Sequence, residues 1–109
     1  MAKQIFGQIG KLKPDKIEAY KALHKNPWPG VLKTIRECNL CHYSIFIQGG
    51  QVFSYFEYIG EDYEADMEFM AKDPVTQEWW KYTKPCFEKY AISEKSEFYH
   101  DMEQIFYYE

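Results

Sequence analysis

Residues 43–59 read YSIFIQGGQVFSYFEYI, two runs of β-branched and aromatic residues separated by a pair of glycines. Such residues favour β-strands. Gly49 and Gly50 can both take the positive φ angles that a two-residue hairpin turn requires. We therefore expect an antiparallel hairpin with strands at 43–48 and 51–59.

The segment before this hairpin carries the pattern of a strand and two helical pieces. Residues 3–10, KQIFGQIG, predict a first strand. A helix should follow from Pro14, which suits a first helical turn, to about His24. The Pro-Trp-Pro sequence that comes next interrupts it, and a second helical piece should run through residues 30–38.

The segment after the hairpin predicts two more helices and a last strand. Residues 61–72 begin with acids, which stabilise a helix N-terminus. Asp73-Pro74 should start another helix that runs to residue 90, and residues 96–109, SEFYHDMEQIFYYE, should close the sheet. The resulting order is the split βαβ of an α+β, ferredoxin-like fold, with helices on one face of an antiparallel sheet.

The other face of that sheet also carries apolar residues. Ile5, Ile45 and Ile47, together with the aromatic residues of 51–59, leave apolar groups pointing both ways. We expect residues 1–109 to form one domain, which is too short to cover both faces by itself. A homodimer that closes sheet on sheet around a two-fold axis would cover them.

Composition excludes several classes of function. The net charge is −4 and the basic residues are scattered among acids, which argues against a nucleic-acid partner. No stretch is apolar enough for a membrane span, and the first residues are too polar for a signal peptide. Three cysteines, an odd number, fit a reducing compartment. We therefore expect a cytoplasmic protein.

Tyr20 and His24 are four residues apart, so a helix would place them on one face. They are either core packing or part of a site for a small polar ligand. The position of His24, just before the proline-rich break, favours a site, because an imidazole there can exchange protons near neutral pH.

Trp79 and Trp80 are adjacent on a predicted helix, where neighbouring side chains differ in direction by about 100°. Both could be structural. Alternatively, one fills the core while the other offers a flat surface to a ligand, as aromatic rings in binding sites do.

The Cys38-Asn-Leu-Cys41 sequence has the spacing of a redox or metal motif. It falls at the end of a predicted helix, where the dipole disfavours a thiolate, and a zinc site would need further ligands from Cys86, His42 or His100. We therefore expect reduced, structural thiols and no metal.

Glu57 lies in the middle of a predicted strand, and it either belongs to the exposed face or turns toward a cleft. The sequence lacks a G-x-S-x-G motif, a glycine-rich phosphate loop and an H-E-x-x-H motif. Acyl transfer, nucleotide chemistry and metalloprotease chemistry therefore have no support.

Taken together, these stretches resemble the L-rhamnose mutarotase family over nearly the whole chain. The resemblance rests on EAYKALHKNPWPGV, CHYSIFI, VFSYFEYIG, QEWWKYTKP and the final MEQIFYYE. It implies a dimeric α+β barrel of the ferredoxin-like type. It also implies an isomerase that interconverts the α and β anomers of a 6-deoxyhexose, L-rhamnose above all, without a cofactor.

The resemblance also assigns roles to individual residues. It implies that His24 is the proton donor, that Tyr20 and Tyr43 bind the sugar, and that Trp79 and Trp80 are the tandem tryptophans of the site. The chain departs from the family pattern at Gly30, after the Trp-Pro pair, and at Gln48, after the strand that contains Tyr43. These positions bear on sugar specificity more than on proton transfer.

Two alternatives use the same fold. One is a small monooxygenase or haem-binding protein of the dimeric ferredoxin-like barrel type, in which His24 would be a haem ligand or lie near a quinone. The other is a module that binds a monosaccharide without catalysing its conversion.

Overall fold

The predicted hairpin is confirmed in the computed structural model, which describes residues 3–88 and 99–108. Its strands are β2 (Leu40–Gln48) and β3 (Gln51–Tyr58). Gly49 has a φ of 61° at the turn, in the left-handed region that a glycine adopts without steric cost. The paired glycines therefore fix where the chain reverses.

An antiparallel sheet forms around this hairpin in the order β2-β3-β1-β4. β1 (Gln4–Leu12) pairs with β3 along almost its whole length. Two short strands, β4 (Phe87–Glu88) and β5 (His100–Asp101), pair with the other edge of β1. This order and the placement of the helices confirm the α+β, ferredoxin-like fold expected from the sequence.

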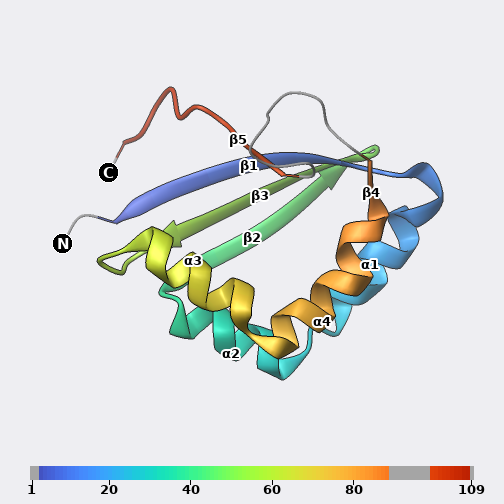
Figure 1. Cartoon of the computed structure of the whole chain (residues 1–109). Helices are drawn as coiled ribbons and strands as arrows, with labels where there is room; N and C mark the ends of the chain where they lie inside the picture. Colours follow the sequence, from blue (N-terminus) through green and yellow to red (C-terminus); the bar gives the residue numbers. More distant parts are fainter. Residues whose placement is uncertain (1–2, 89–98, 109) are drawn as a thin grey trace.

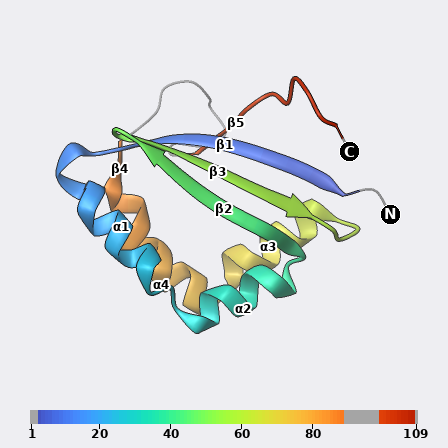
Figure 2. The ribbon, with the colours of Figure 1, turned by 180° about the vertical axis from the view of Figure 1, so that it is seen from behind.

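The described helices all pack on one face of the sheet, so the structure has two layers (Figures 1 and 2). They are η1 (Pro14–Lys16), α1 (Ile17–Lys25), α2 (Pro29–Glu37), α3 (Tyr63–Lys72), α4 (Pro74–Thr83) and η2 (Lys84–Cys86). Pro29 and Pro74 stand in the first turns of α2 and α4, and Asp62 and Asp73 cap α3 and α4. None of the helices in the described part of the chain has the length and apolar composition that crossing a bilayer requires.

The predicted helix that starts at Asp73 is wrong in its second half. α4 ends at Thr83, and after the 3-10 turn η2 the chain enters β4, which pairs with β1. Pro85 explains this ending, because it has no N–H to donate and its ring clashes with a continuing helix. Residues 89–90 of the prediction lie outside the described residues.

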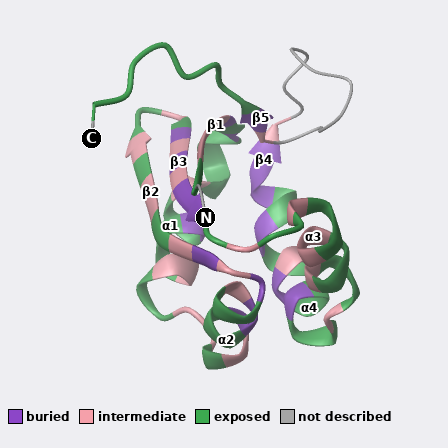
Figure 3. Cartoon of the chain, turned by 90° about the vertical axis from the view of Figure 1, so that its left-hand side faces the viewer, coloured by how far each residue is buried: buried purple, intermediate pink, exposed green. Residues whose placement is uncertain are grey.

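The predicted closing strand, 96–109, is shorter than expected. Of the described part of this predicted strand, only His100 and Asp101 form a strand, β5, which pairs with β1. Met102 N–H still donates to the Gly7 oxygen of β1 at 2.7 Å, and the chain to residue 108 continues as an exposed segment (Figure 3). β4 pairs with Lys11 and Leu12 of the same edge of β1, and β5 pairs with Gln8 and Ile9 beside it. Residues 96–98 and 109 of the prediction lie outside the described residues.

The face of the sheet that meets the helices carries two apolar clusters with a polar pair between them. One cluster contains Leu12 and Val52, and the other contains Phe56. Gln8 and Ser54, which are partners in the β1–β3 register, lie between these clusters along their strands. They therefore place polar groups at the middle of an otherwise apolar floor.

β2 contains a β-bulge near its start. The register changes from Cys41 opposite Glu57 to Ser44 opposite Tyr55, so β2 has one extra residue at this point. His42, inside the bulge, has a φ of 51°. Because side chains alternate between faces along a strand, the extra residue reverses which later side chains face the helices.

Candidate active site

A cavity of about 570 Å³ lies between the sheet and the helical layer. The five residues singled out from the sequence all line it: Tyr20, His24, Tyr43, Trp79 and Trp80. They come from α1, β2 and α4, which the fold brings around one space. The structure therefore gathers every predicted site residue, and their chemical roles remain predictions.

His24 is held in one orientation by the preceding turn of α1. Its Nδ1 lies 2.9 Å from the backbone oxygen of Tyr20. Because a carbonyl oxygen can only accept, Nδ1 carries the proton of this hydrogen bond. The ring also packs against the Tyr20 ring, with centroids 4.4 Å apart, and edge-on to Trp79 at 5.4 Å. Nε2 is therefore the nitrogen left to exchange a proton in the cavity.

Tyr20 is buried, with 4% of its surface exposed. Burial raises the pKa of its hydroxyl to about 12, so the phenol is uncharged at neutral pH. This hydroxyl lies 2.9 Å from the hydroxyl of Tyr99, whose pKa is also raised by burial and by the neighbouring Tyr20. Tyr20 can therefore donate or accept a hydrogen bond in the cavity, but it is no anionic base.

The two tryptophans have different surroundings. Trp79 is 7% exposed, and its ring makes edge-on contacts with the rings of His24 and Trp28 at 5.4 and 5.2 Å. Trp80 is half-buried, and the ammonium group of Lys84 lies 4.4 Å from its ring centre. Trp79 is therefore a fixed part of the wall, whereas Trp80 keeps more surface for contact with a ligand.

Tyr43 enters the cavity from β2. Its ring stacks on the ring of Phe56, with centroids 5.1 Å apart and planes 27° from parallel. Surrounding protein atoms bury the Tyr43 hydroxyl and raise its pKa. Water still reaches 39% of the residue, because it lines a cavity that solvent can enter. The hydroxyl is thus an uncharged hydrogen-bonding group.

Tyr99 and Gln8 also line the cavity, although sequence reasoning missed both. Gln8 lies 3.4 Å from the Ser54 hydroxyl and donates to the carboxylate of Asp101 at 2.8 Å. Tyr99 and its partner Tyr20 are 79 residues apart, so no local spacing could pair them. From the sequence, Gln8 could be recognised only as a polar residue at a position of the first strand that faces the helices.

Potential metal ligands lie on the opposite face of the sheet from the cavity. Glu57 is 8% exposed there, and it accepts a hydrogen bond from His42 Nδ1 at 3.0 Å. Among the described residues, Cys41, His42 and Glu57 are the one group of three side chains that could hold an ion. Cys38, the other half of the C-x-x-C sequence, is a buried free thiol whose pKa is raised by that burial, which disfavours a reactive thiolate.

Comparisons with known proteins relate the whole chain to one family. The family model for L-rhamnose mutarotase matches residues 6–108. The L-rhamnose mutarotase of Shouchella clausii is 32% identical over 101 residues, which cover 91% of this chain and 92% of that protein. The L-rhamnose mutarotase of Bacillus subtilis is 35% identical over 95 residues, which cover 85% and 86%.

A solved structure shares the fold. The crystal structure of an L-rhamnose mutarotase from Formosa agariphila superposes with a TM-score of 0.76 at 21% identity, covering 97% of this chain and 99% of that chain. At this identity the likeness supports the fold, while the family model and the relatives above establish the family. The chain belongs to the L-rhamnose mutarotase family, whose members are carbohydrate isomerases.

Proposed function

We propose that the protein interconverts the α and β anomers of a 6-deoxyhexose, with L-rhamnose as its substrate, by acid–base catalysis and without a cofactor. Family membership supports the sugar and the reaction class. The observation that carries the mechanism is the anchored ring of His24, whose Nδ1 is engaged and whose Nε2 is left for proton exchange in the cavity.

Anomer exchange requires two proton transfers. The anomeric hydroxyl loses a proton, the ring oxygen gains one, the ring opens, and the carbonyl turns before the ring closes on its other side. Neutral His24 can accept a proton at Nε2, and the imidazolium can donate it from the same atom. One such group accelerates a reaction by about 10²- to 10⁴-fold, which suits a conversion that already proceeds slowly in water.

The uncharged phenols orient the sugar. Tyr20 keeps its proton at neutral pH, so its hydroxyl positions a sugar oxygen by hydrogen bonding and leaves proton transfer to His24. The hydrogen bond to the Tyr99 hydroxyl holds the Tyr20 hydroxyl in place. Tyr43 offers a third hydroxyl to the cavity. It comes from β2 in the sheet, whereas Tyr20 comes from helix α1.

The apolar part of the lining recognises the C–H surface of the sugar and its methyl group. Trp79 and Trp80 offer aromatic surface, and Ile35, Met67 and Met70 line the same cavity from α2 and α3. The volume of 570 Å³ is within the range of about 300–1,000 Å³ that is usual for small-molecule sites. A sugar with a 6-methyl group in place of a hydroxyl fits such a wall without leaving a polar group unpaired.

The proposal is tested by NMR measurement of anomer exchange with and without protein. L-rhamnose should exchange faster with the protein present, and L-mannose, which differs by its 6-hydroxyl, should respond less. His24→Ala should remain folded and bind the sugar weakly, yet lose about 10²-fold or more in exchange rate. Lys25→Ala, at the exposed neighbouring position, is the control and should behave as wild type.

Two results would contradict the proposal. If the protein binds L-rhamnose without accelerating exchange, it is a sugar-binding module. If folded His24→Ala exchanges the sugar at the wild-type rate, the acid–base group is elsewhere and the histidine is core packing.

A further inference from the structure

The β-bulge in β2 decides that Tyr43 faces the cavity. Leu40, before the bulge, is buried against the helices. With strict alternation from Leu40, residue 43 would point to the outer face and so would Ile45. In the structure both Tyr43 and Ile45 line the cavity. The extra residue at His42 therefore supplies the change of face that the site needs.

His42 adopts an unfavourable backbone conformation at this point. Its φ of 51° lies in the left-handed region, which residues with a Cβ adopt far less readily than glycine. Its side chain is 74% exposed, so packing does not hold it. The contact that does hold it is the hydrogen bond from His42 Nδ1 to Glu57 at 3.0 Å.

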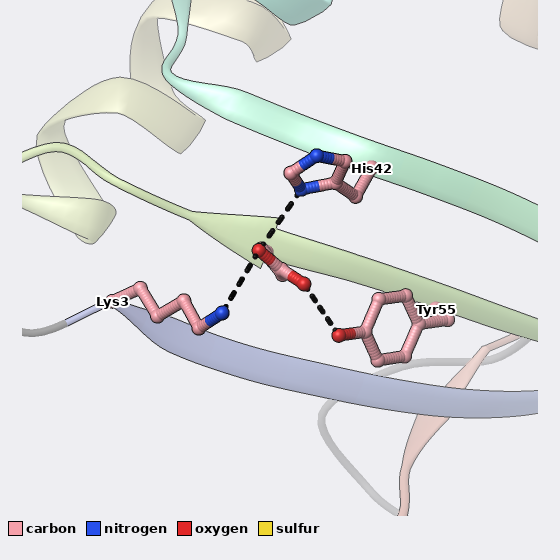
Figure 4. Close-up of polar contacts among 4 residues, drawn as sticks. Lys3, His42 and Tyr55 are labelled. Carbon is pink, nitrogen blue, oxygen red and sulfur yellow. Dashed lines mark hydrogen bonds and ion pairs between the residues drawn. The ribbon is translucent and has the colours of Figure 1, made fainter. Parts of the chain in front are cut away.

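Glu57 is a firm anchor for this contact. It lies on the neighbouring strand with 8% exposure, and its carboxylate also accepts from the Tyr55 hydroxyl at 2.6 Å and lies 3.5 Å from the Lys3 ammonium (Figure 4). The hydrogen bonds from Tyr55 and His42 lower the pKa of Glu57, so the carboxylate is charged at neutral pH. These three partners contact both carboxylate oxygens of Glu57. The arrangement therefore favours a structural role for Glu57 over an ion site that Cys41 would complete.

We propose that the hydrogen bond between Glu57 and His42, on the outer face of the sheet, fixes the bulge that turns Tyr43 into the sugar site. We call this pair the bulge clamp. Both members are positioning residues, because they act on the sugar only through Tyr43. The part of the inference that concerns the sugar rests on the proposed function, while the placement of the ring does not.

The placement of the ring is tested first, without sugar. His42→Gly removes the donor but tolerates the positive φ, so any effect comes from the lost clamp and not from added backbone strain. His42→Asn is the rescue variant, since Asn also tolerates this conformation and its amide nitrogen occupies the same place along the side chain as Nδ1. Tyr55→Phe is the control, because it removes a hydrogen bond from the same carboxylate and leaves the bond from His42 in place.

The readout is the nuclear Overhauser effect between the rings of Tyr43 and Phe56, which stack in the wild type. It should weaken or vanish in His42→Gly and persist in His42→Asn and Tyr55→Phe. If it is unchanged both in folded His42→Gly and in folded His42→Ala, which lacks the donor but keeps the Cβ that disfavours the positive φ, the inference is wrong, whatever the protein does to sugars.

The second measurement asks whether the clamp acts through Tyr43. His42→Gly should raise KM for L-rhamnose by about threefold to tenfold with little change in kcat, the size expected for one hydrogen bond that is no longer formed. In a Tyr43→Phe background, His42→Gly should raise KM no further. If the two changes simply add, the clamp does not act through Tyr43.

The two proposals fail in different ways. If Tyr43→Phe alone binds L-rhamnose as wild type does, the role of Tyr43 in the proposed function is wrong, and so is the link from the clamp to the sugar. If Tyr43→Phe weakens binding but His42→Gly does not, only the inference about the clamp is wrong.

Discussion

Trp79 and Trp80 are neighbours in α4, yet single substitutions at them should have different consequences. Trp79 is 7% exposed and packs between the rings of His24 and Trp28, so Trp79→Ala should lower the free energy of unfolding by about 3–5 kcal/mol. Trp80→Ala should cost less stability, and it should mainly raise KM, because stacking on a sugar is present in the ground state and the transition state alike. Urea unfolding and sugar titration would check both. Equal losses of stability would contradict the assignment of Trp79 to packing and of Trp80 to contact with the sugar.

Tyr20 should make stability fall with pH in the alkaline range. Its folded pKa of about 12 lies above its ordinary value of 10.0, so the unfolded chain loses this proton first as the pH rises. The stabilisation is complete below pH 10 and is lost as the pH rises toward about 12. Two pKa units correspond to about 2–3 kcal/mol.

The matched experiment compares wild type with Tyr20→Phe in urea unfolding between pH 8 and about pH 11. Tyr43 and Tyr99 have raised pKa values as well, so both proteins should lose stability in the same direction. The fall should be shallower in Tyr20→Phe. If stability falls equally with pH in the two proteins, Tyr20 has the same pKa in the folded and the unfolded state.

At the scale of helices and strands, Asp73 joins the N-terminus of α4 to the middle of α2. Its carboxylate caps α4 by accepting from Thr76 N at 2.9 Å and Thr76 Oγ1 at 2.8 Å, and it also accepts from Thr34 of α2 at 3.0 Å. Asp73→Ala should therefore lower the free energy of unfolding by about 2 kcal/mol, at the upper end for a helix cap.

Asp62 provides the matched comparison for Asp73. It caps α3 with a single exposed bond from Ala65 N at 3.1 Å, so Asp62→Ala should cost less, about 0.5–1 kcal/mol. Urea unfolding of the two variants would measure the difference. A smaller loss for Asp73→Ala than for Asp62→Ala would contradict the role of Asp73 as a link between α2 and α4.

The whole molecule leaves large apolar side chains exposed outside the cavity. On the outer face of the sheet Phe46 is 65% exposed, and in the segment after β5 Ile105 and Phe106 are 89% and 79% exposed. Soluble monomers rarely expose large apolar patches, so exposed side chains of this size are candidates for an interface. The homodimer expected from the sequence would cover them, and it remains a prediction.

Light scattering at micromolar concentration should therefore give twice the chain mass of 13.1 kDa. Phe46→Ser should shift the protein toward the monomer, because it removes apolar surface from the expected interface. Ile59→Ser, an equally large change at a side chain that is 51% exposed beyond the end of β3, is the comparison. A wild-type mass of 13.1 kDa would exclude the dimer at that concentration.

Local signals in the sequence determined most of the elements. The hairpin follows from two apolar runs around Gly49 and Gly50, and the starts of α2 and α4 follow from Pro29 and Pro74. These signals work because turn geometry and proline restraint act within a few residues. The order of the elements then led to the ferredoxin-like fold. Short-range spacing and the family resemblance pointed to five of the residues that line the cavity.

Only the tertiary structure decided the features that depend on distant contacts. β4 and β5 share one edge of β1, a pairing between segments that are remote in the chain. Tyr99 joins the site because the fold brings it to Tyr20 across 79 residues. The bulge at His42 exists because Leu40 and Tyr43 must both face the helices, and no pattern of alternation within β2 reveals that requirement. In each case the position of one segment is fixed by packing against another that is remote in the chain, and such packing leaves no periodic mark on the sequence.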